Sequence, residues 1–476
     1  MKELANLIIS RLPTEIQYGD TRVMSETNET IIVKNGKVEN VEITETSGFG
    51  VRVLLNGGWG FASSSKLDKG AVDSIIKQTI NIAWASGIAK SAKGVELTPS
   101  PKVEGYYKTP YKEDPFKVPL EEKVALLLEI DKILKQSPYI KVAEAMISSK
   151  RVKKVFASTD GSIIEQEILI SGANITATAI EDSELQIRSY GNFGTAGYEF
   201  VRSLDLLGNA QRVREEAGSL LKAKPCPAGK MEIIIDSDLM VLQVHESIGH
   251  AVELDRVLGT EASYAGSSFV TIDKLNKFKY GSEIVNITAD ANVPKGLGTF
   301  GWDDEGVPAQ DTPIIRDGIF TGYLSSRDTA PIIKRQSSGA MRASSWNRIP
   351  LIRMTNVNLE PGEWKLDNLI ADTKKGLFLQ TNKSWSIDDK RENFQFGVEL
   401  AREIKNGQLG EIVKDATYTG YTPEFWGNCN AICNRDYWKM YGTMNCGKGE
   451  PGQIMYVGHG TTPARFKNVQ VGVFKK

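Results

Sequence analysis

The sequence predicts an α+β fold, with N-terminal and middle α/β units followed by a mostly β C-terminal domain. Up to about residue 224, strand-like runs alternate with amphipathic helical patterns, whereas strand signals dominate from Cys226 onward. The exception in this later part is a helical motif that carries two of the three histidines in the chain, His245 and His250. We therefore expect the C-terminal domain to wrap around a distorted metal-binding helix.

Length and composition limit the possible domain organisation. The 476 residues are enough for two or three domains with a large core. We predict an N-terminal α/β domain over residues 1–98, a linker over 99–118, a middle α+β unit over 119–224 and a C-terminal domain over 225–476. The sequence shows no internal repeat and no low-complexity segment.

The N-terminal unit begins with a short amphipathic helix over residues 2–12. Apolar and polar residues then alternate from Tyr18 to Ser64, with turns at Asn35-Gly36 and Asn56-Gly57-Gly58, which predicts an antiparallel meander. Asp68 is a suitable N-cap for the helix that follows. The apolar side of that helix includes Val72, Ile75, Ile76, Ile80 and Ala83.

The middle unit follows a segment rich in Pro and Tyr between Gly94 and Pro119, which indicates a linker or an extended wrap over the surface. Residues 120–136 predict a helix, Asp160-Gly161 predicts a hairpin turn, and a helix near Val201–Ala223 closes the unit. The predicted strands of this unit are Val152–Ala157, Ile163–Ser171 and Asn174–Ile180.

The C-terminal domain is predicted from strand signals that are separated by turns. These turns are expected at Asp317-Gly318, Asn406-Gly407 and Asn445–Gly449. We interpret the acidic run Asp303-Asp304-Glu305 as a solvated turn in preference to a cation site. For Arg342 and for Arg353–Asn356 we expect packing or turn roles, with a place along a substrate path as the alternative.

Composition argues against several classes of protein. The 58 basic and 59 acidic residues nearly balance, so we expect no direct nucleic-acid or membrane partner. No apolar run approaches the roughly 20 residues that a membrane-spanning helix needs, and we expect no signal peptide. Four cysteines in a chain of this length argue against a disulfide framework, so a cytoplasmic protein is expected.

The motif His245-Glu246-x-x-x-His250 is the strongest sign of chemistry in the sequence. A strand-like run over Met231–Asp236 precedes it, and Ser237 is a suitable N-cap for its helix. In a regular helix, positions i and i+5 lie about 140° apart, so the two histidines could bind one metal only if the helix loosens between them. Gly249 is where we expect this distortion to cost least.

Chance placement of two core histidines is the alternative to a metal site. Histidine is otherwise nearly absent from the chain, and Glu253 and Asp255 follow as possible outer-shell partners, so we favour the metal. A catalytic zinc usually takes three protein ligands. From the residues alone, the third could be any of several side chains: Cys429, Cys433, Cys446, His459 or Glu253. Of these, the Cys429/Cys433 pair is more readily explained as buried packing.

The motif resembles a known family signature. His245–Asp255 (HESIGHAVELD) resembles the HExxGHxxExD motif of the TldD/PmbA family, in the TldD branch of zinc-dependent peptidases. The segments Gly339–Glu363, Asn393–Gly420 and Met444–Gln453 also resemble family segments, whereas the first 220 residues match only in layout. The resemblance implies that Cys446 is the third ligand of one Zn²⁺ per chain.

The resemblance also implies a substrate and a quaternary structure. Unfolded proteins or short peptides would be hydrolysed with weak sequence specificity, held by a strand edge in a chamber between two subunits. The chain would form a homodimer, or a heterodimer with a homologous inactive subunit. Rival functions are a zinc hydrolase acting on a non-peptide amide, a non-catalytic regulatory or binding subunit, and an indirect modulator of DNA gyrase.

Two further side chains have candidate catalytic roles. Glu246 is the candidate general base, which would take a proton from a water activated by the metal and return it to the leaving amine. A binding subunit would have no need of this carboxylate. His459 could stabilise the tetrahedral oxyanion or bind substrate, or it could equally be a loop histidine of no consequence.

Overall fold

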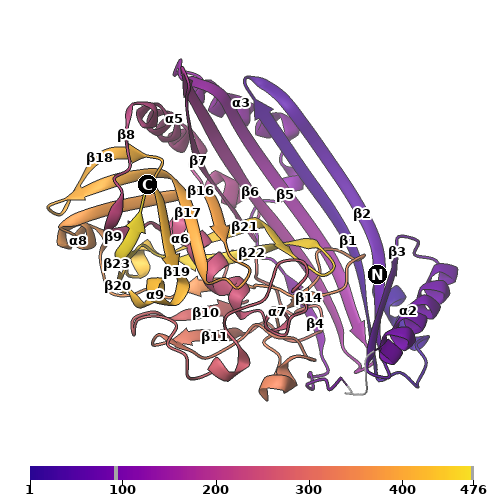
Figure 1. Ribbon diagram of the computed structural model, residues 1–476. Coiled ribbons are helices and arrows are strands. Elements are labelled where there is room, and N and C mark those ends of the chain that lie inside the picture. Colours follow the sequence, from indigo (N-terminus) through magenta and orange to yellow (C-terminus); the bar gives the residue numbers. More distant parts are fainter. Residues whose placement is uncertain (90–94, 473–476) are drawn as a thin grey trace.

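The computed structural model describes residues 1–89 and 95–472. It confirms the α+β class, with a long, mainly antiparallel sheet on one side and a mostly β C-terminal part beside it (Figure 1). The start of the predicted Pro- and Tyr-rich segment, at Gly94, lies outside the described residues. The division into three units at the predicted boundaries stays a prediction.

Seven strands form the N-terminal sheet, in the order β3-β2-β1-β5-β6-β4, with β7 also paired to β6. The predicted meander is confirmed, since β1, β2 and β3 pair antiparallel through turns that begin at Asn35 and Asn56, both with positive φ. Strand bounds are β1 Tyr18–Lys34, β2 Lys37–Leu55, β3 Gly58–Ser64, β4 Glu104–Lys108, β5 Ile140–Ser158, β6 Ile163–Glu181 and β7 Glu184–Gly194.

Several strands are longer than the sequence indicated. Residues 163–180 form the single strand β6, although we predicted two strands separated near Gly172. The glycine marks a close contact and not a turn, because a Cβ at this position would lie 2.3 Å from the ring of Phe193. Residues 104–108, inside the predicted linker, pair in parallel with β6 as strand β4.

Helices cover parts of this sheet. Asp68 caps α2 as predicted, because its Oδ1 accepts a hydrogen bond from Ala71 N at 2.9 Å. The helix predicted near Val201–Ala223 is interrupted at Ser203–Asp205, where Asp205 has φ 44° and caps the second part. Helix bounds are α1 Lys2–Ser10, α2 Lys69–Ala89, α3 Leu120–Leu134, α4 Tyr198–Arg202 and α5 Leu206–Lys222.

A closed barrel forms the centre of the C-terminal part. Its strands follow the order β16-β9-β23-β19-β17, and β17 pairs back to β16. The strands of this part are β8 Lys224–Pro225, β9 Gly229–Ile235, β10 Ile287–Asp290, β11 Asp311–Arg316, β12 Ile319–Phe320, β13 Met341–Arg342, β14 Leu351–Ile352, β15 Val357–Leu359, β16 Lys375–Ile387, β17 Asn393–Lys405, β18 Gln408–Lys414, β19 Thr417–Tyr421, β20 Cys429–Ile432, β21 Lys439–Lys448, β22 Gln453–Thr461 and β23 Ala464–Val471.

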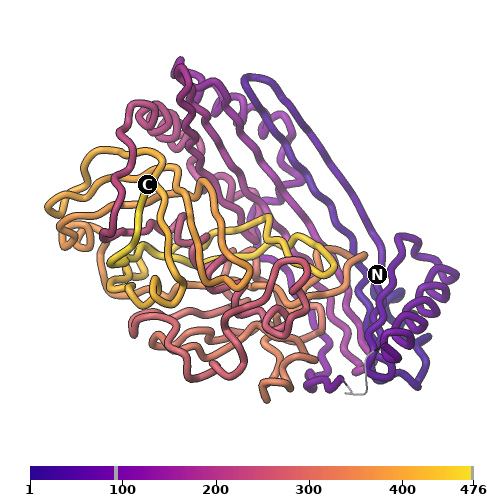
Figure 2. Tube along the Cα trace, viewed as in Figure 1, coloured from indigo at the N-terminus to yellow at the C-terminus, as the bar shows by residue number. Residues whose placement is uncertain are grey.

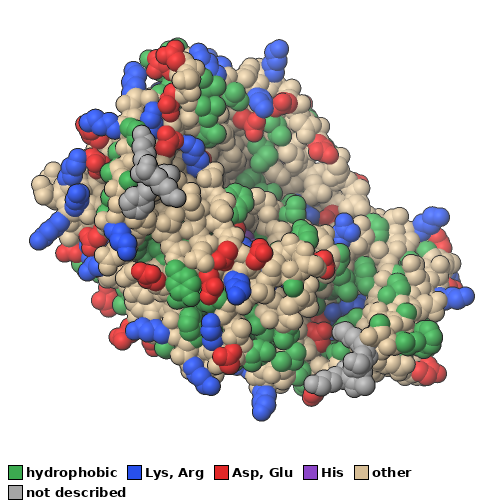
Figure 3. Space-filling view, viewed as in Figure 1, with side chains coloured by type: hydrophobic (Ala, Val, Ile, Leu, Met, Phe, Trp, Pro, Cys, Tyr) green, Lys and Arg blue, Asp and Glu red, His purple; other side chains and the backbone are tan. Residues whose placement is uncertain are grey.

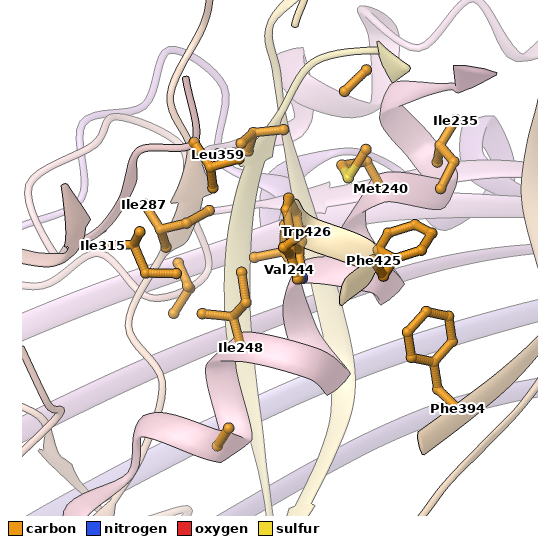
Figure 4. Close-up of a cluster of buried hydrophobic side chains, with 14 of the residues drawn as sticks. Ile235, Met240, Val244, Ile248, Ile287, Ile315, Leu359, Phe394, Phe425 and Trp426 are labelled. Atoms are coloured by element: carbon orange, nitrogen blue, oxygen red, sulfur yellow. The ribbon is translucent and has the colours of Figure 1, made fainter. Parts of the chain in front are cut away.

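The helix of the histidine motif is fixed by the core of this part. Its helices are α6 Ser237–Val244, α7 Leu254–Val257, α8 Leu366–Asp372 and α9 Thr422–Gly427. Met240, Val244 and Ile248 are fully buried among aromatic side chains that include Trp426 (Figure 4). Each such side chain contributes roughly 1.5–3 kcal/mol on burial. One side of the helix is thereby held in the core, which leaves the other side for a site.

The acidic run Asp303-Asp304-Glu305 is buried, so its interpretation as a solvated turn is wrong. Asp304 pairs with Lys154 at 2.7 Å and Glu305 pairs with Arg52 at 3.0 Å. Both cations lie on strands of the N-terminal sheet, so these ion pairs join that sheet to the C-terminal part. Local sequence could not reveal partners that lie 150 and 253 residues away.

The surface agrees with the balanced composition. Basic and acidic side chains are interspersed over the face drawn in Figure 3.

The chain trace in Figure 2 shows the long hairpins of the N-terminal sheet running past the C-terminal part. In residues 1–89 and 95–472, no helix combines the length and the apolar composition that a membrane crossing requires.

Candidate metal centre

The helix of the motif loosens between its two histidines, as the spacing predicted. Helix α6 ends at Val244, a π-helical turn covers His245–Gly249, and a 3₁₀ turn covers His250–Val252. His250 N donates to the carbonyl of His245, the i to i+5 bond of a π turn. This wider turn brings both imidazoles to the same side of the helix.

The ends of this helix are built differently from our expectation. Asp236 and not Ser237 is the N-cap, because its carboxylate accepts from Ser237 N at 2.7 Å. Gly249 has ordinary helical φ and ψ, so backbone freedom is not why glycine is needed. A Cβ there would lie 2.3 Å from Sδ of Met354, so glycine allows Met354 to pack closely beneath the π turn.

Three potential metal ligands meet beside the π turn. One ligand atom from each of His245, His250 and Cys446 lies within 4.8 Å of the others, and all three side chains are buried. Cys446 lies on β21, so the turn predicted at Asn445–Gly449 begins later than expected. Cys429 and Cys433 are buried elsewhere in the core, in agreement with a packing role.

One distance between the candidate ligand atoms fits a tetrahedral metal. His250 Nε2 and Cys446 Sγ are 3.7 Å apart. A tetrahedral zinc at about 2.0–2.1 Å from nitrogen and about 2.3 Å from sulfur would separate these two atoms by about 3.5 Å. The donor set of two imidazoles and one thiolate is also one that zinc accepts in catalytic sites.

The other ring nitrogens have protein partners. His250 Nδ1 is 2.9 Å from Oε2 of Glu253, and His245 Nδ1 is 2.8 Å from Nε2 of His459. In each ring, Nε2 is therefore the nitrogen left for a metal. Such outer-shell partners orient the ligands and set which nitrogen carries the proton.

The protonation states of the three side chains suit metal binding. Burial lowers the pKa of His245 and that of His250, which favours the neutral imidazoles that a metal requires. Burial alone would raise the pKa of the Cys446 thiol, but Arg353 and His250 outweigh it, and the pKa is lowered. The surroundings therefore ease formation of the thiolate that a metal requires, although the site is buried.

A buried lysine, which the sequence did not indicate, supports this centre. Nζ of Lys448 lies 2.7 Å from Asp255, 3.2 Å from Glu253 and 3.7 Å from Glu261, and the Lys448 side chain has no exposed surface. Burial would lower the pKa of Lys448, but these carboxylates raise it. Burial raises the pKa of Asp255 to about 6. Lys448 thereby neutralises the carboxylate that holds His250.

Replacing Lys448 by Met is expected to destabilise the metal-free protein by about 3–5 kcal/mol, since three buried carboxylates lose their shared cation. The measurement is the midpoint of chemical denaturation in the presence of a chelator. Lys405→Met is the matched control, because Lys405 pairs with Glu403 on the surface and such pairs contribute little. Equal midpoints for the two variants would contradict the prediction.

The candidate base is held by an arginine that the sequence also failed to indicate. Arg391, in the turn between β16 and β17, donates from Nη1 to Oε2 of Glu246 at 2.7 Å. The carbonyl of Arg391 accepts from Oγ1 of Thr422 at 2.8 Å, which fixes the turn. Glu246 Oε1 makes no hydrogen bond within the described part of the chain, so one oxygen of this carboxylate remains free.

A cavity of about 480 Å³ opens over the three ligands and the base. Asp255 and His459 are not among the described residues that line it. The lining combines apolar side chains, charged side chains and a stretch of β21: Phe193, Asp238, Val241, Leu242, His245, Glu246, His250, Asn382, Trp385, Arg391 and Gly442–Gly447. The arrangement could hold an extended ligand beside a metal and a carboxylate.

Models of three PmbA/TldA metallopeptidase domains match the chain in order: domain 1 at residues 19–83, the central domain at 113–224 and the C-terminal domain at 228–473. The chain is 33% identical over 444 residues to a metalloprotease of Methanocaldococcus jannaschii, covering 93% of this chain and 94% of that protein. It is 23% identical over 455 residues to a zinc metalloprotease TldD homolog of Saccharolobus solfataricus, covering 94% of each.

A solved structure shares the fold. TldE from Thermococcus kodakarensis superposes with a TM-score of 0.76 at 16% identity, covering 99% of this chain and 100% of that one. At this identity the likeness concerns the fold alone. The three domain matches together cover most of the chain, and the archaeal relative matches along nearly its whole length. The chain is therefore a member of the PmbA/TldD family of metallopeptidases.

Proposed function

We propose that this metallopeptidase depends on zinc and hydrolyses peptide bonds in unfolded proteins or short peptides, with weak sequence preference. One observation carries the proposal: the ligand atoms of His245, His250 and Cys446 converge in a cavity that also holds the free oxygen of Glu246. A ligand set without this carboxylate would serve a structural metal equally well. The adjacent base favours hydrolysis.

Zinc is supported by the donor atoms and by one relative. Two imidazole nitrogens and a thiolate suit zinc better than they suit magnesium or calcium, which prefer oxygen ligands. The relative from Saccharolobus solfataricus carries zinc in its name. When bound, zinc would act as a Lewis acid that lowers the pKa of a water molecule and polarises the scissile carbonyl.

Glu246 would move the proton in this reaction. Arg391 holds Oε2, which keeps the carboxylate in the cavity and leaves Oε1 to accept a proton from the attacking water. Glu246 then returns this proton to the amine as the peptide bond breaks. Glu246 and the three candidate ligands are buried side chains, which strengthens their electrostatic interactions.

Strand β21 supports an extended peptide as the substrate. Residues Gly442–Gly447 of this strand line the cavity, and among the described strands β21 pairs only with β22. The N–H of Gly442 already donates to Asn192 Oδ1, and the carbonyl of Cys446 accepts from Arg353. A peptide could pair with the rest of this edge through its backbone, which would explain weak sequence preference. Phe193 and Trp385 add apolar surface for side chains of varied shape.

The assembly that we propose is a dimer, either of this chain with itself or with a homologous inactive subunit. The likeness of the fold to TldE supports a homologous partner. Either arrangement would enclose the cavity and keep folded proteins from reaching it. Peptide hydrolysis measured with and without the partner chain distinguishes the two.

Zinc removal is expected to abolish hydrolysis reversibly. We expect about one zinc per purified chain, the number that a three-ligand catalytic site takes up, together with cleavage of a quenched unstructured peptide. Dialysis against a chelator should remove both, and added zinc should restore both. A zinc-free protein that still cleaves the peptide, or a zinc-loaded protein that is inactive with and without a partner, would refute the proposal.

A further inference from the structure

The third histidine of the chain, His459, lies behind the candidate ligand His245. It is on β22, it has no exposed surface, and its ring centre is 5.0 Å from that of His245. It is also not among the described residues that line the cavity. Of the two roles considered from the sequence, contact with substrate is therefore not supported by its position.

Both ring nitrogens of His459 are engaged. Nδ1 lies 2.9 Å from the carbonyl oxygen of Val357, and Nε2 lies 2.8 Å from Nδ1 of His245. A tetrahedral zinc at about 2.0–2.1 Å from two nitrogens would hold them about 3.3 Å apart, so the gap of 2.8 Å is that of a hydrogen bond. His459 is therefore not a competing ligand in this arrangement.

The positions of the protons follow from these contacts. A carbonyl oxygen can only accept, so His459 must carry its proton on Nδ1 and donate it to Val357. In the neutral ring, Nε2 then has a lone pair and can only accept. The hydrogen between the two rings must therefore come from Nδ1 of His245. A neutral His245 with its proton on Nδ1 has its lone pair on Nε2, which faces the ligand group.

The backbone on both sides of this contact is fixed. Gly458 N donates to the carbonyl of Thr355 at 3.1 Å, and Gly460 N donates to Oδ1 of Asn358 at 2.7 Å. These bonds connect β22 to β15 and to the residues just before it, and β15 provides the Val357 carbonyl. The Val357 carbonyl and the His459 ring therefore keep a constant relative position. The hydrogen bond between them can then hold His459 in one tautomer.

We propose that His459 is a positioning residue that holds His245 in the tautomer with Nε2 free for the metal. The chain of donors runs from His245 to His459 to the Val357 carbonyl. On the opposite side of the centre, the Glu253 carboxylate does the same for His250. This inference rests on the proposed metal site, but the tautomer itself exists without metal and can be measured separately.

Two variants separate the tautomer effect from packing. In His459→Gln, the side-chain oxygen can reach the position of Nε2 and accept from His245. In His459→Asn, the shorter amide reaches only the position of Nδ1, so the bond to Val357 can remain while the acceptor is lost. We expect His459→Gln to keep zinc affinity within about threefold and His459→Asn to lose about 10–100-fold, the usual effect of an outer-shell partner.

Zinc affinity is measured by competition with a chelating dye, and the unfolding midpoint of each metal-free variant is measured beside it. Equal midpoints with unequal affinities support the proposal. Equal zinc affinities for the two variants at equal midpoints would overturn it. If neither variant folds, the tautomers of the histidines in wild-type protein decide the proposal.

Nitrogen NMR of the imidazole rings reads the tautomers directly in wild-type protein without metal. The chain has only three histidines, so the spectrum contains three ring systems. We expect the proton on Nδ1 in both His245 and His459, with Nε2 unprotonated in each. A proton on Nε2 of His459 would overturn the proposal. Wild-type protein that shows the expected tautomers but binds no zinc would instead refute the proposed function and leave the tautomer assignment standing.

Discussion

Replacing Glu246 by Gln is expected to reduce peptide hydrolysis by about 10²–10⁴-fold, the range for loss of a general base, with zinc content unchanged. Gln has nearly the shape of Glu, and its oxygen can still accept the hydrogen bond of Arg391. The amide cannot take up a proton at neutral pH, so only the transfer step is lost. The measurement is kcat on a quenched unstructured peptide, with zinc determined on the same sample.

The unfolding midpoint serves as the control for Glu246→Gln. The change leaves the charge of Arg391 without its carboxylate in a partly exposed position, which could lower stability. Activity must therefore be compared at a temperature where both proteins are folded. Glu424→Gln, an exposed carboxylate on α9, should change neither zinc nor activity. If Glu246→Gln binds zinc and is as active as the wild type, Glu246 is not the general base.

The local geometry of the centre could be predicted from sequence because it depends on spacing along one helix. Histidines at i and i+5 diverge on a regular helix, so one metal between them requires a wider turn. The π turn over His245–Gly249 confirms this. The reason for glycine at 249 could not be predicted, since it depends on Met354, which comes from a distant segment.

Sequence reasoning missed the charged side chains that support the site from segments distant from the histidine motif. Arg391 lies 145 residues after Glu246 and meets it only because the β16–β17 turn reaches the cavity. Lys448 carries no local sign of burial, and its three carboxylate partners, Glu253, Asp255 and Glu261, lie in and around α7, far from it in the sequence. Charged residues are expected at the surface unless they are paired, and the pairing is visible only in the folded chain.

The lengths of the long strands also depend on partners that are distant in the sequence, so they could be predicted only in part. Alternation predicted the meander and the β-rich C-terminal part, because side-chain direction alternates along a strand whatever its partners. It could not show that β5 begins at Ile140 or that β6 continues through Gly172. Strand length there is set by pairing with neighbours, as in the ladder that joins Asp20–Lys34 of β1 to Glu144–Ser158 of β5.

Replacing Cys446 by Ala is expected to lower zinc affinity by more than about 100-fold, and to abolish hydrolysis with it. Loss of an outer-shell partner already costs about 10–100-fold, and a direct ligand contributes more than its supports. Removing the thiolate would leave two imidazoles, fewer than the three protein ligands usual for a catalytic zinc. Zinc content after dialysis and affinity by dye competition are the measurements.

Cys429→Ala is the matched control for this prediction. Cys429 is also a buried thiol, but it lies on β20 in the core, and burial raises its pKa to about 12, so it stays protonated. Both variants remove the same atom from a buried site, so any difference in zinc reports ligation and not packing. Equal zinc loss would mean that packing defects cause it. Full zinc in Cys446→Ala would exclude Cys446 as the third ligand.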